Sequence, residues 1–229
     1  MPTEITWLGH SSFALRTSNH DVLVDPFLDD SPTAPIKADN VAADTILLTH
    51  GHFDHVSDAV AIAKRTGAVV VANFEIGEWL KTQGVAEDKI VAMNTGGSAL
   101  LPFGKVKMTW AQHSSSLPDG TYGGVAGGFV LHLPEGRVYF AGDTAVNLDM
   151  KLIGVGGLAL AVLPIGDLFT MGPNDAMEAI AFLSPKRVIP CHYNTWPPIQ
   201  QDAEAWAERV RLHTTAEPIV LQPGGQVSL

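Results

Sequence analysis

Three histidines and one aspartate lie close together in the segment Thr-His-Gly-His-Phe-Asp-His at residues 49–55. Neutral imidazole and carboxylate groups suit zinc, iron, manganese or nickel better than calcium or magnesium. A sharp turn at Gly51 would let His50 and His52 face one ion, and Asp54 and His55 would then face a second ion nearby. The alternative is a polar loop with surface histidines, but three of the chain's nine histidines in one short segment favour a metal site.

Further candidate ligands come later in the chain, and each follows a predicted strand within one to three residues. These are His113, Asp143 and His192, and His50 has the same position after an earlier strand. Alone, each has an ordinary interpretation: a solvated or hydrogen-bonded histidine, or an Asx turn in the case of Asp143. Because strand ends meet at one rim of a sheet, where α/β folds commonly build sites, we expect the four side chains to converge. Asp143 could then bridge two cations, since each carboxylate oxygen can bind one.

The elements that position these residues alternate along the chain, which has no long linker, charge block or internal repeat. This alternation favours a single α/β domain over residues 1–229. We expect a helix that begins with Ser57 as its N-cap and ends at Gly67. The other expected helices cover 74–83, 174–183 and 200–212. The expected strands cover 4–7, 12–17, 22–24, 44–49, 68–72, 106–112, 128–133, 137–141, 158–163, 187–190 and 219–221.

The composition narrows the kind of partner. The formal net charge is −10, which argues against a surface that tracks nucleic acid, although bound cations could still attract a small anionic substrate. The single cysteine, Cys191, excludes an internal disulfide and should pack as a small apolar group. No signal peptide is evident, and the longest apolar stretch, residues 154–165, is shorter than the roughly 20 residues that span a membrane. We therefore expect a cytoplasmic protein with a small-molecule substrate and no membrane or nucleic-acid partner.

The pattern H-x-H-x-D-H, followed by a histidine, an aspartate after glycine and a late histidine, resembles the metallo-β-lactamase superfamily over nearly the whole chain. The opening segment Trp-Leu-Gly-His-Ser-Ser-Phe at residues 7–13 is similar to the branch that contains ascorbate-6-phosphate lactonase and a group of uncharacterised metal-dependent hydrolases. The resemblance implies a four-layer αββα sandwich, in which two mixed sheets are flanked by helices and the site lies at one edge of the sheets. Members of this branch often assemble, so a homo-oligomer is an open expectation.

The same resemblance implies two divalent metal ions, with zinc expected first and manganese, iron or nickel as alternatives. His50, His52 and His113 would hold one ion, whereas Asp54, His55 and His192 would hold the other. Asp143 would bridge the two, and a form with one ion stays open. Such ions activate a bridging water as hydroxide. The implied reaction is hydrolysis of a lactone, thioester or phosphodiester, with Asp54 and Asp143 as the catalytic carboxylates.

Three rival interpretations and three residues stay open at this stage. A diiron redox protein of this fold typically has Glu where this chain has His52, and a nuclease fits the acidic charge poorly. A structural metal site would more often be rich in cysteine.

Asp25 either orients a ligand or belongs to a turn before proline, and His10 either lines the pocket or is structural. Asn194 is better explained as an ordinary loop residue than as a substrate contact.

Overall fold

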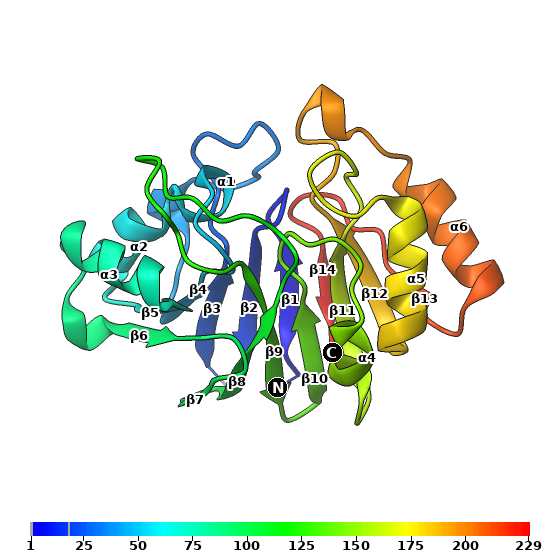
Figure 1. Ribbon diagram of the computed structural model, residues 1–229, viewed down its shortest axis with the longest axis horizontal. Coiled ribbons are helices and arrows are strands. Elements are labelled where there is room, and N and C mark those ends of the chain that lie inside the picture. Colours follow the sequence, from blue (N-terminus) through cyan, green and yellow to red (C-terminus); the bar gives the residue numbers. More distant parts are fainter. Residues whose placement is uncertain (1, 18) are drawn as a thin grey trace.

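Two seven-stranded mixed sheets face each other in the computed structural model, which describes residues 2–17 and 19–229 (Figure 1). The first sheet has the order β14 (Gln226–Ser228), β1 (Glu4–Trp7), β2 (Phe13–Thr17), β3 (His20–Val24), β4 (Thr45–Leu47), β5 (Val69–Asn73) and β6 (Ile90–Met93). The second has the order β13 (Glu217–Pro218), β12 (Pro185–Cys191), β11 (Leu158–Pro164), β10 (Gly136–Phe140), β9 (Gly127–Leu133), β8 (Gly104–Trp110) and β7 (Ser98–Leu101).

Helices cover the outer face of each sheet, so that the layers run helix, sheet, sheet, helix (Figure 1). The α-helices are α1 (Phe53–Val56), α2 (Ala59–Thr66), α3 (Phe74–Thr82), α4 (Asp149–Gly154), α5 (Pro173–Leu183) and α6 (Ala203–His213). The 3-10 turns are η1 (Ala38–Asn40), η2 (Glu87–Lys89) and η3 (Pro197–Ile199). Within the described residues, no helix has both the length and the apolar character needed to cross a bilayer. The αββα architecture expected from the sequence is confirmed.

Two apolar cores hold the layers together. The larger core lies between the sheets and continues under α5 and α6, where Trp206 is buried. The smaller core lies between the first sheet and helices α2 and α3. Strand β4 contacts both, because Ile46 belongs to the smaller core and Leu47 to the larger one. A strand buried on both faces is a continuous apolar run in sequence, which is why this one was predictable.

Most expected elements are present. The helix α4 was not expected, and the errors among the strands have a common physical cause. Strands β6, β7 and β14 were not predicted, and the last predicted strand lies at Glu217–Pro218 instead of 219–221. All four are edge strands, and their partly exposed residues give weak hydrophobic patterns. The helix expected to start after Ser57 begins at Ala59, because residues 53–56 form the separate turn α1.

Candidate metal centre

The first group of candidate ligands consists of His50, His52 and His113, whose donor atoms all lie within 4.8 Å of one another. His50 Nε2 lies 3.0 Å from His52 Nδ1, and His113 Nε2 lies 3.3 Å from the same atom. His50, three residues after the end of β4, is fully buried, whereas His52 and His113 are partly exposed. We call these three residues the outer set.

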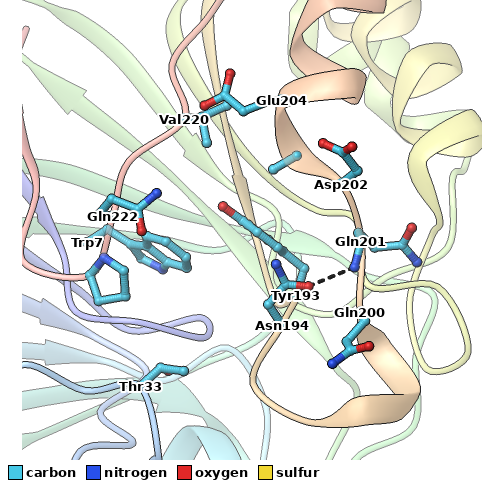
Figure 2. Close-up of a pocket in the computed structure, with 12 residues that line it drawn as sticks. Trp7, Thr33, Tyr193, Asn194, Gln200, Gln201, Asp202, Glu204, Val220 and Gln222 are labelled. Atoms are coloured by element: carbon cyan, nitrogen blue, oxygen red, sulfur yellow. Dashed lines mark hydrogen bonds between the residues drawn. The ribbon is translucent and has the colours of Figure 1, made fainter.

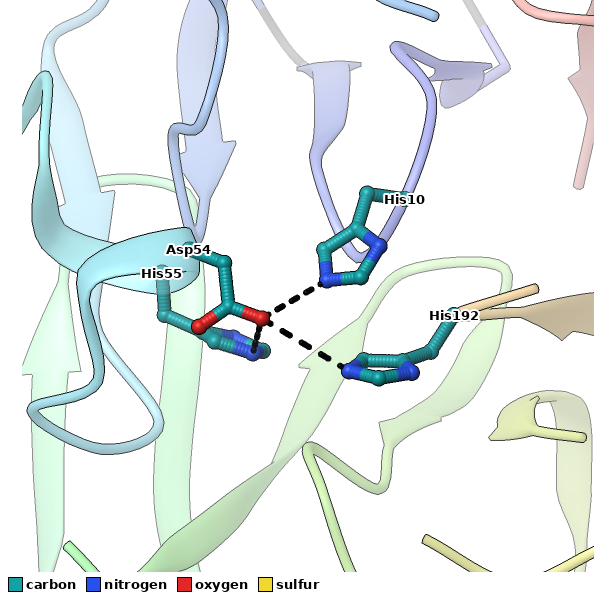
Figure 3. Close-up of side chains that lie close together, drawn as sticks. All are labelled: His10, Asp54, His55 and His192. Atoms are coloured by element: carbon teal, nitrogen blue, oxygen red, sulfur yellow. Dashed lines mark hydrogen bonds and ion pairs between the residues drawn. The ribbon is translucent and has the colours of Figure 1, made fainter. Parts of the chain in front are cut away.

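The second group consists of His10, Asp54, His55 and His192, and all four residues are buried. We call them the inner set (Figure 3). Asp54 Oδ2 lies 2.9 Å from His10 Nε2 and 3.8 Å from the Nε2 atoms of both His55 and His192. The inner set therefore contains the three ligands predicted for a second ion and adds His10 to them.

Asp143 lies between the two sets. Its Oδ2 atom is 3.0 Å from His192 Nε2 and 3.4 Å from His55 Nε2 in the inner set. The same atom is 3.7 Å from His113 Nε2 and 3.9 Å from His50 Nε2 in the outer set. A carboxylate that bridges two cations would need this position. All seven predicted ligands thus lie together at one rim of the molecule.

The backbone takes unusual conformations at this rim. His10, Asp25, His192 and Asn194 all have positive φ angles, between 45° and 59°, in the left-handed region that few residues other than glycine adopt. Such strain costs on the order of 1 kcal/mol or more per residue and clusters at functional sites. Gly142, with φ of 64°, turns the chain just before Asp143, where a side chain would meet the carbonyl oxygen of Gly127.

Gly51 serves a different purpose from the one expected. Its φ angle is not positive, so it provides no left-handed turn. A Cβ atom at this position would instead lie 3.0 Å from the carbonyl oxygen of Ser116 and 3.2 Å from Leu117. The glycine therefore allows the loop after β8, which supplies His113, to pack closely against the cluster. His52 and Asp54 are separated by the start of α1 rather than by a turn at the glycine.

A network centred on Asp25 orients one ligand of each set. Asp25 Oδ2 accepts a hydrogen bond from His55 Nδ1 at 2.9 Å, which leaves Nε2 of His55 free to face the site. The same oxygen accepts the hydroxyl hydrogen of Thr49 at 2.6 Å, and the Thr49 oxygen lies 3.1 Å from His50 Nδ1. Asp25 thus supports His55 directly and His50 through Thr49. Of its two expected roles, the geometry matches orientation of a ligand.

His10 is held in a similar way on the inner side. Its Nδ1 atom lies 2.7 Å from the Thr195 hydroxyl and its Nε2 atom lies 2.9 Å from Asp54. Since an ionised carboxylate can only accept, Nε2 carries the proton and Nδ1 accepts from Thr195. His10 follows β1 by three residues, so the strand-end position used to choose the candidate ligands could also have singled it out.

The electrostatics of the inner set favour positive charge on His55 and His192, whose pKa values are raised, whereas burial and the neighbouring His192 lower the pKa of His10 to about 4. Burial disfavours the charged form of His192, but the adjacent carboxylates of Asp143 and Asp54 outweigh this and raise its pKa to about 9. Burial also opposes ionisation of Asp143, yet His192 and His55 hold its pKa well below the usual value. In the outer set the direction is opposite, because burial and the neighbouring His55 lower the pKa of His50.

These residues fit divalent metal ions. The buried atoms His55 Nε2 and Asp143 Oδ1 have no hydrogen-bond partner among the residues that the structure describes, although buried polar atoms normally have one. Both belong to residues whose other atoms are fully engaged in the cluster. Imidazole nitrogens and carboxylate oxygens are the donors that zinc, manganese, iron and nickel accept.

A pocket of about 530 Å³ lies over the cluster and includes His52, Asp54, His113, Asp143 and His192. Its remaining walls are Phe53, Ser114, Phe169, Trp196 and Pro198. Ser114 and Phe169 come from the loops at residues 114–122 and 167–173. The sequence contained no signal for Phe53 or Trp196 as pocket residues.

A larger hollow of about 1000 Å³ lies beside the stacked rings of Trp7 and Tyr193, next to Asn194 (Figure 2). None of the candidate ligands lines it, so we place the chemistry in the smaller pocket. The Asn194 side chain accepts a hydrogen bond from the backbone N–H of Gln201 at 2.7 Å, which agrees with an ordinary loop residue. Cys191 is buried in the larger core, as expected of a small apolar group.

Known proteins resemble this chain over most of its length. The model of the family described as "Beta-lactamase superfamily domain" matches residues 20–193. A UPF0173 metal-dependent hydrolase of Thermus thermophilus is 49% identical over 221 residues, which cover 96% of each chain. One from Symbiobacterium thermophilum is 46% identical and covers 99% of this chain and 100% of its own. Igni18, a metallo hydrolase from the archaeon Ignicoccus hospitalis, superposes with a TM-score of 0.90 at 32% identity, covering 100% of this chain and 99% of its own.

Proposed function

The chain belongs to the metallo-β-lactamase superfamily and is a metal-dependent hydrolase, and on this premise we propose that it attacks a small ester-like substrate with hydroxide at a two-metal centre. The substrate classes that this chemistry serves are lactones, thioesters and phosphodiesters. The observation that carries the proposal is the position of Asp143, whose Oδ2 atom lies within 3.9 Å of histidines from both sets.

One ion would be held by His50, His52 and His113. The other ion would be held by Asp54, His55 and His192, and Asp143 would contact both ions. When bound, such ions lower the pKa of water so that hydroxide is available near neutral pH, and they withdraw charge from the substrate oxygen. Zinc is the first choice for an imidazole-rich set of this kind, with manganese, iron and nickel as the alternatives.

The chain's own residues bind, orient and transfer protons around this chemistry. Asp25 keeps the Nε2 atom of His55 directed toward the centre. Asp54 lines the pocket and is held by His10, so it is placed to orient the attacking oxygen and to accept its proton. The Phe53 and Trp196 side chains line the pocket over the centre and add an apolar surface beside it.

The test begins with the metal content of the purified protein, measured by plasma mass spectrometry. The ions are then removed with a chelator and zinc, manganese, iron or nickel is restored singly. A lactone, a thioester and a phosphodiester serve as the substrate panel. We expect the stripped protein to be inactive and at least one metal to restore hydrolysis of at least one class. Full activity after complete removal of metal would refute the proposal.

A pair of histidine variants separates loss of the centre from a general effect of the mutation. His50→Ala removes a fully buried candidate ligand and should lower both metal content and activity. His213→Ala changes an exposed histidine at the end of α6 and should alter neither. Circular dichroism would show whether His50→Ala keeps the fold.

A further inference from the structure

The pocket over the candidate metal centre has an aromatic wall. The rings of Phe53 and Trp196 lie 6.0 Å apart, and both contact the buried Phe27, at 5.8 and 5.9 Å between ring centroids. Phe27 in turn contacts His10 of the inner set. The aromatic surface therefore extends from the inner ligands to the pocket mouth, where 55% of Phe53 is exposed to solvent. An apolar surface left open to water beside a reactive centre indicates a binding surface.

Phe169 adds a third aromatic side chain to the pocket, from a separate loop that is held in place. The left-handed residues Asp167 and Leu168 turn the chain just before it, and Phe169 remains 55% exposed. The Asp167 carbonyl accepts from Thr170 at 2.9 Å. Met171 donates to the carbonyl oxygen of Thr144, the residue after Asp143, also at 2.9 Å. Phe169 is thus anchored to the strand end that supplies the shared carboxylate.

The segments that line the pocket contain no lysine or arginine. Residues 48–58, 111–127, 141–150, 164–178 and 191–208 contain none of the chain's 14 lysines and arginines, whereas each contains at least one Asp or Glu. Recognition of a phosphate or carboxylate group normally uses Arg or Lys. None of these segments contains an Arg or Lys side chain that could bind such a group.

Bound metal ions would not supply the missing positive charge. Two divalent ions carry four positive charges, and Asp25, Asp54, Asp143 and one hydroxide together return four negative ones. The centre would therefore be close to neutral, and the other residues that line the pocket add no Lys or Arg. An anionic group outside the reacting bond would find no net attraction there, while an aromatic ring would gain from leaving water.

We propose that this pocket selects uncharged substrates with an aromatic or similarly apolar group beside the bond to be broken. Phe53, Phe169 and Trp196 recognise that group. The inference rests on the proposed hydrolytic function and narrows it to neutral carboxylic esters, lactones and thioesters. Phosphodiesters and phosphorylated sugars are excluded as preferred substrates.

Three hydroxamates test the inference by direct binding, independently of turnover. Each presents the same metal-binding group to the zinc-loaded protein, and calorimetry measures its affinity. Benzohydroxamate should bind about tenfold more tightly than acetohydroxamate, because its ring reaches the aromatic wall. 4-Carboxybenzohydroxamate should lose that gain. Tighter binding of the carboxylated compound, or no advantage for the ring, would overturn the inference.

Variants locate the effect. Phe169→Ala and Trp196→Ala should each reduce the preference for benzohydroxamate over acetohydroxamate to about threefold or less. Phe169→Lys should favour 4-carboxybenzohydroxamate relative to the unmodified protein. Phe74→Ala is the matched control, because Phe74 is an equally exposed phenylalanine (52%) on α3, outside this pocket. An identical loss of preference in the control would contradict the assignment.

A matched substrate pair separates this inference from the proposed function. Methyl 4-acetoxybenzoate and 4-acetoxybenzoate carry the same acetyl ester, and only the second is anionic. After division by the rate of hydrolysis in free hydroxide, kcat/KM should favour the neutral ester by about tenfold. A preference for the anion would overturn the inference and leave hydrolysis standing. Hydrolysis of neither ester, nor of any other panel substrate, together with intact hydroxamate discrimination would refute the hydrolytic function alone.

Discussion

The two ligand sets at the rim differ in burial, in charge and in the contacts behind them. In the inner set every residue is buried, and two of its ligands are held by further side chains, His55 by Asp25 and Asp54 by His10. In the outer set His52 and His113 are partly exposed and line the pocket. The supporting contacts of this set come from hydroxyl groups and not from a carboxylate: Thr49 contacts His50 Nδ1 at 3.1 Å and Ser114 lies 3.5 Å from His52 Nε2.

The difference indicates a division of roles. A ligand held by a buried carboxylate loses little freedom when it binds an ion, so the inner set is preorganised. The outer set faces the space where a substrate would enter. Because both sets meet at Asp143, the division is testable by changes that affect both sets, one set, or a single contact behind one set.

The largest effect should follow from Asp143→Ala, which removes the carboxylate that both sets share. We expect metal content below one ion per chain and a loss of about a thousandfold or more in kcat/KM, because each set loses an anionic donor. Plasma mass spectrometry and steady-state kinetics would measure the two quantities. Asp149→Ala, at an exposed carboxylate on α4, is the control. Full metal occupancy with unchanged turnover in the Asp143 variant would contradict the assignment.

The second-largest effect should come from a change of pH, which should alter the metal affinities of the two sets to different extents. His192 has a pKa raised to about 9, so in the metal-free protein it holds a proton at neutral pH that an ion must displace. Affinity at the inner set should therefore fall about tenfold per pH unit for each displaced proton, as the pH decreases from about 9 toward 6.5. Burial keeps the outer histidines' pKa values low, so their affinity should change little over this range.

Calorimetry in buffers of different ionisation enthalpy would count the protons released by each ion. If the affinities for the two ions depended equally on pH, the two sets would not differ in the number of protons that a metal ion must displace.

Asp25→Asn should weaken the inner set by about tenfold to a hundredfold, because His55 loses the carboxylate that orients it. The outer set should be affected less, since its link to Asp25 passes through a hydroxyl group. Thr49→Val sharpens the contrast, because it removes the link to His50 and keeps the Asp25–His55 pair. Competition with a chelating dye would give both affinities.

Asp58→Asn is the matched control for this measurement. Its carboxylate is also buried, but it accepts from the backbone N–H groups of Leu28 and Asp29 and contacts no candidate ligand. Metal affinity should be unchanged there. A loss similar to that of Asp25→Asn would mean that Asp25 acts on general stability.

The smallest effect should come from His10, which supports Asp54 through one hydrogen bond. His10→Ala should speed the release of the inner ion by about tenfold. His10→Gln should recover much of this, because its amide nitrogen can reach the position of Nε2 and donate to Asp54. Stopped-flow mixing with a chelator would measure the release rate. If the glutamine variant behaved like the alanine variant, His10 would act by packing alone.

The sequence by itself determined the types and order of the candidate ligands, and its resemblance to a known family implied the layered fold. The ligands at residues 50–55 are neighbours in the chain, so their proximity needed no knowledge of the fold. Strand β4 could be recognised because burial on both faces leaves a continuous apolar pattern, whereas the edge strands β6, β7 and β14 left no such pattern.

Only the tertiary structure decided how the loops meet. His10 reaches Asp54 across 44 residues and Thr195 across 185, and neither pairing has a signature in local periodicity. The aromatic residues Phe53, Phe169 and Trp196 come from three segments that share the pocket only because the two sheets pack face to face. Periodicity reports which side of an element is buried, but contacts between loops depend on how the elements are packed. The candidate ligands could therefore be predicted, while the contacts behind them and the pocket above them could not.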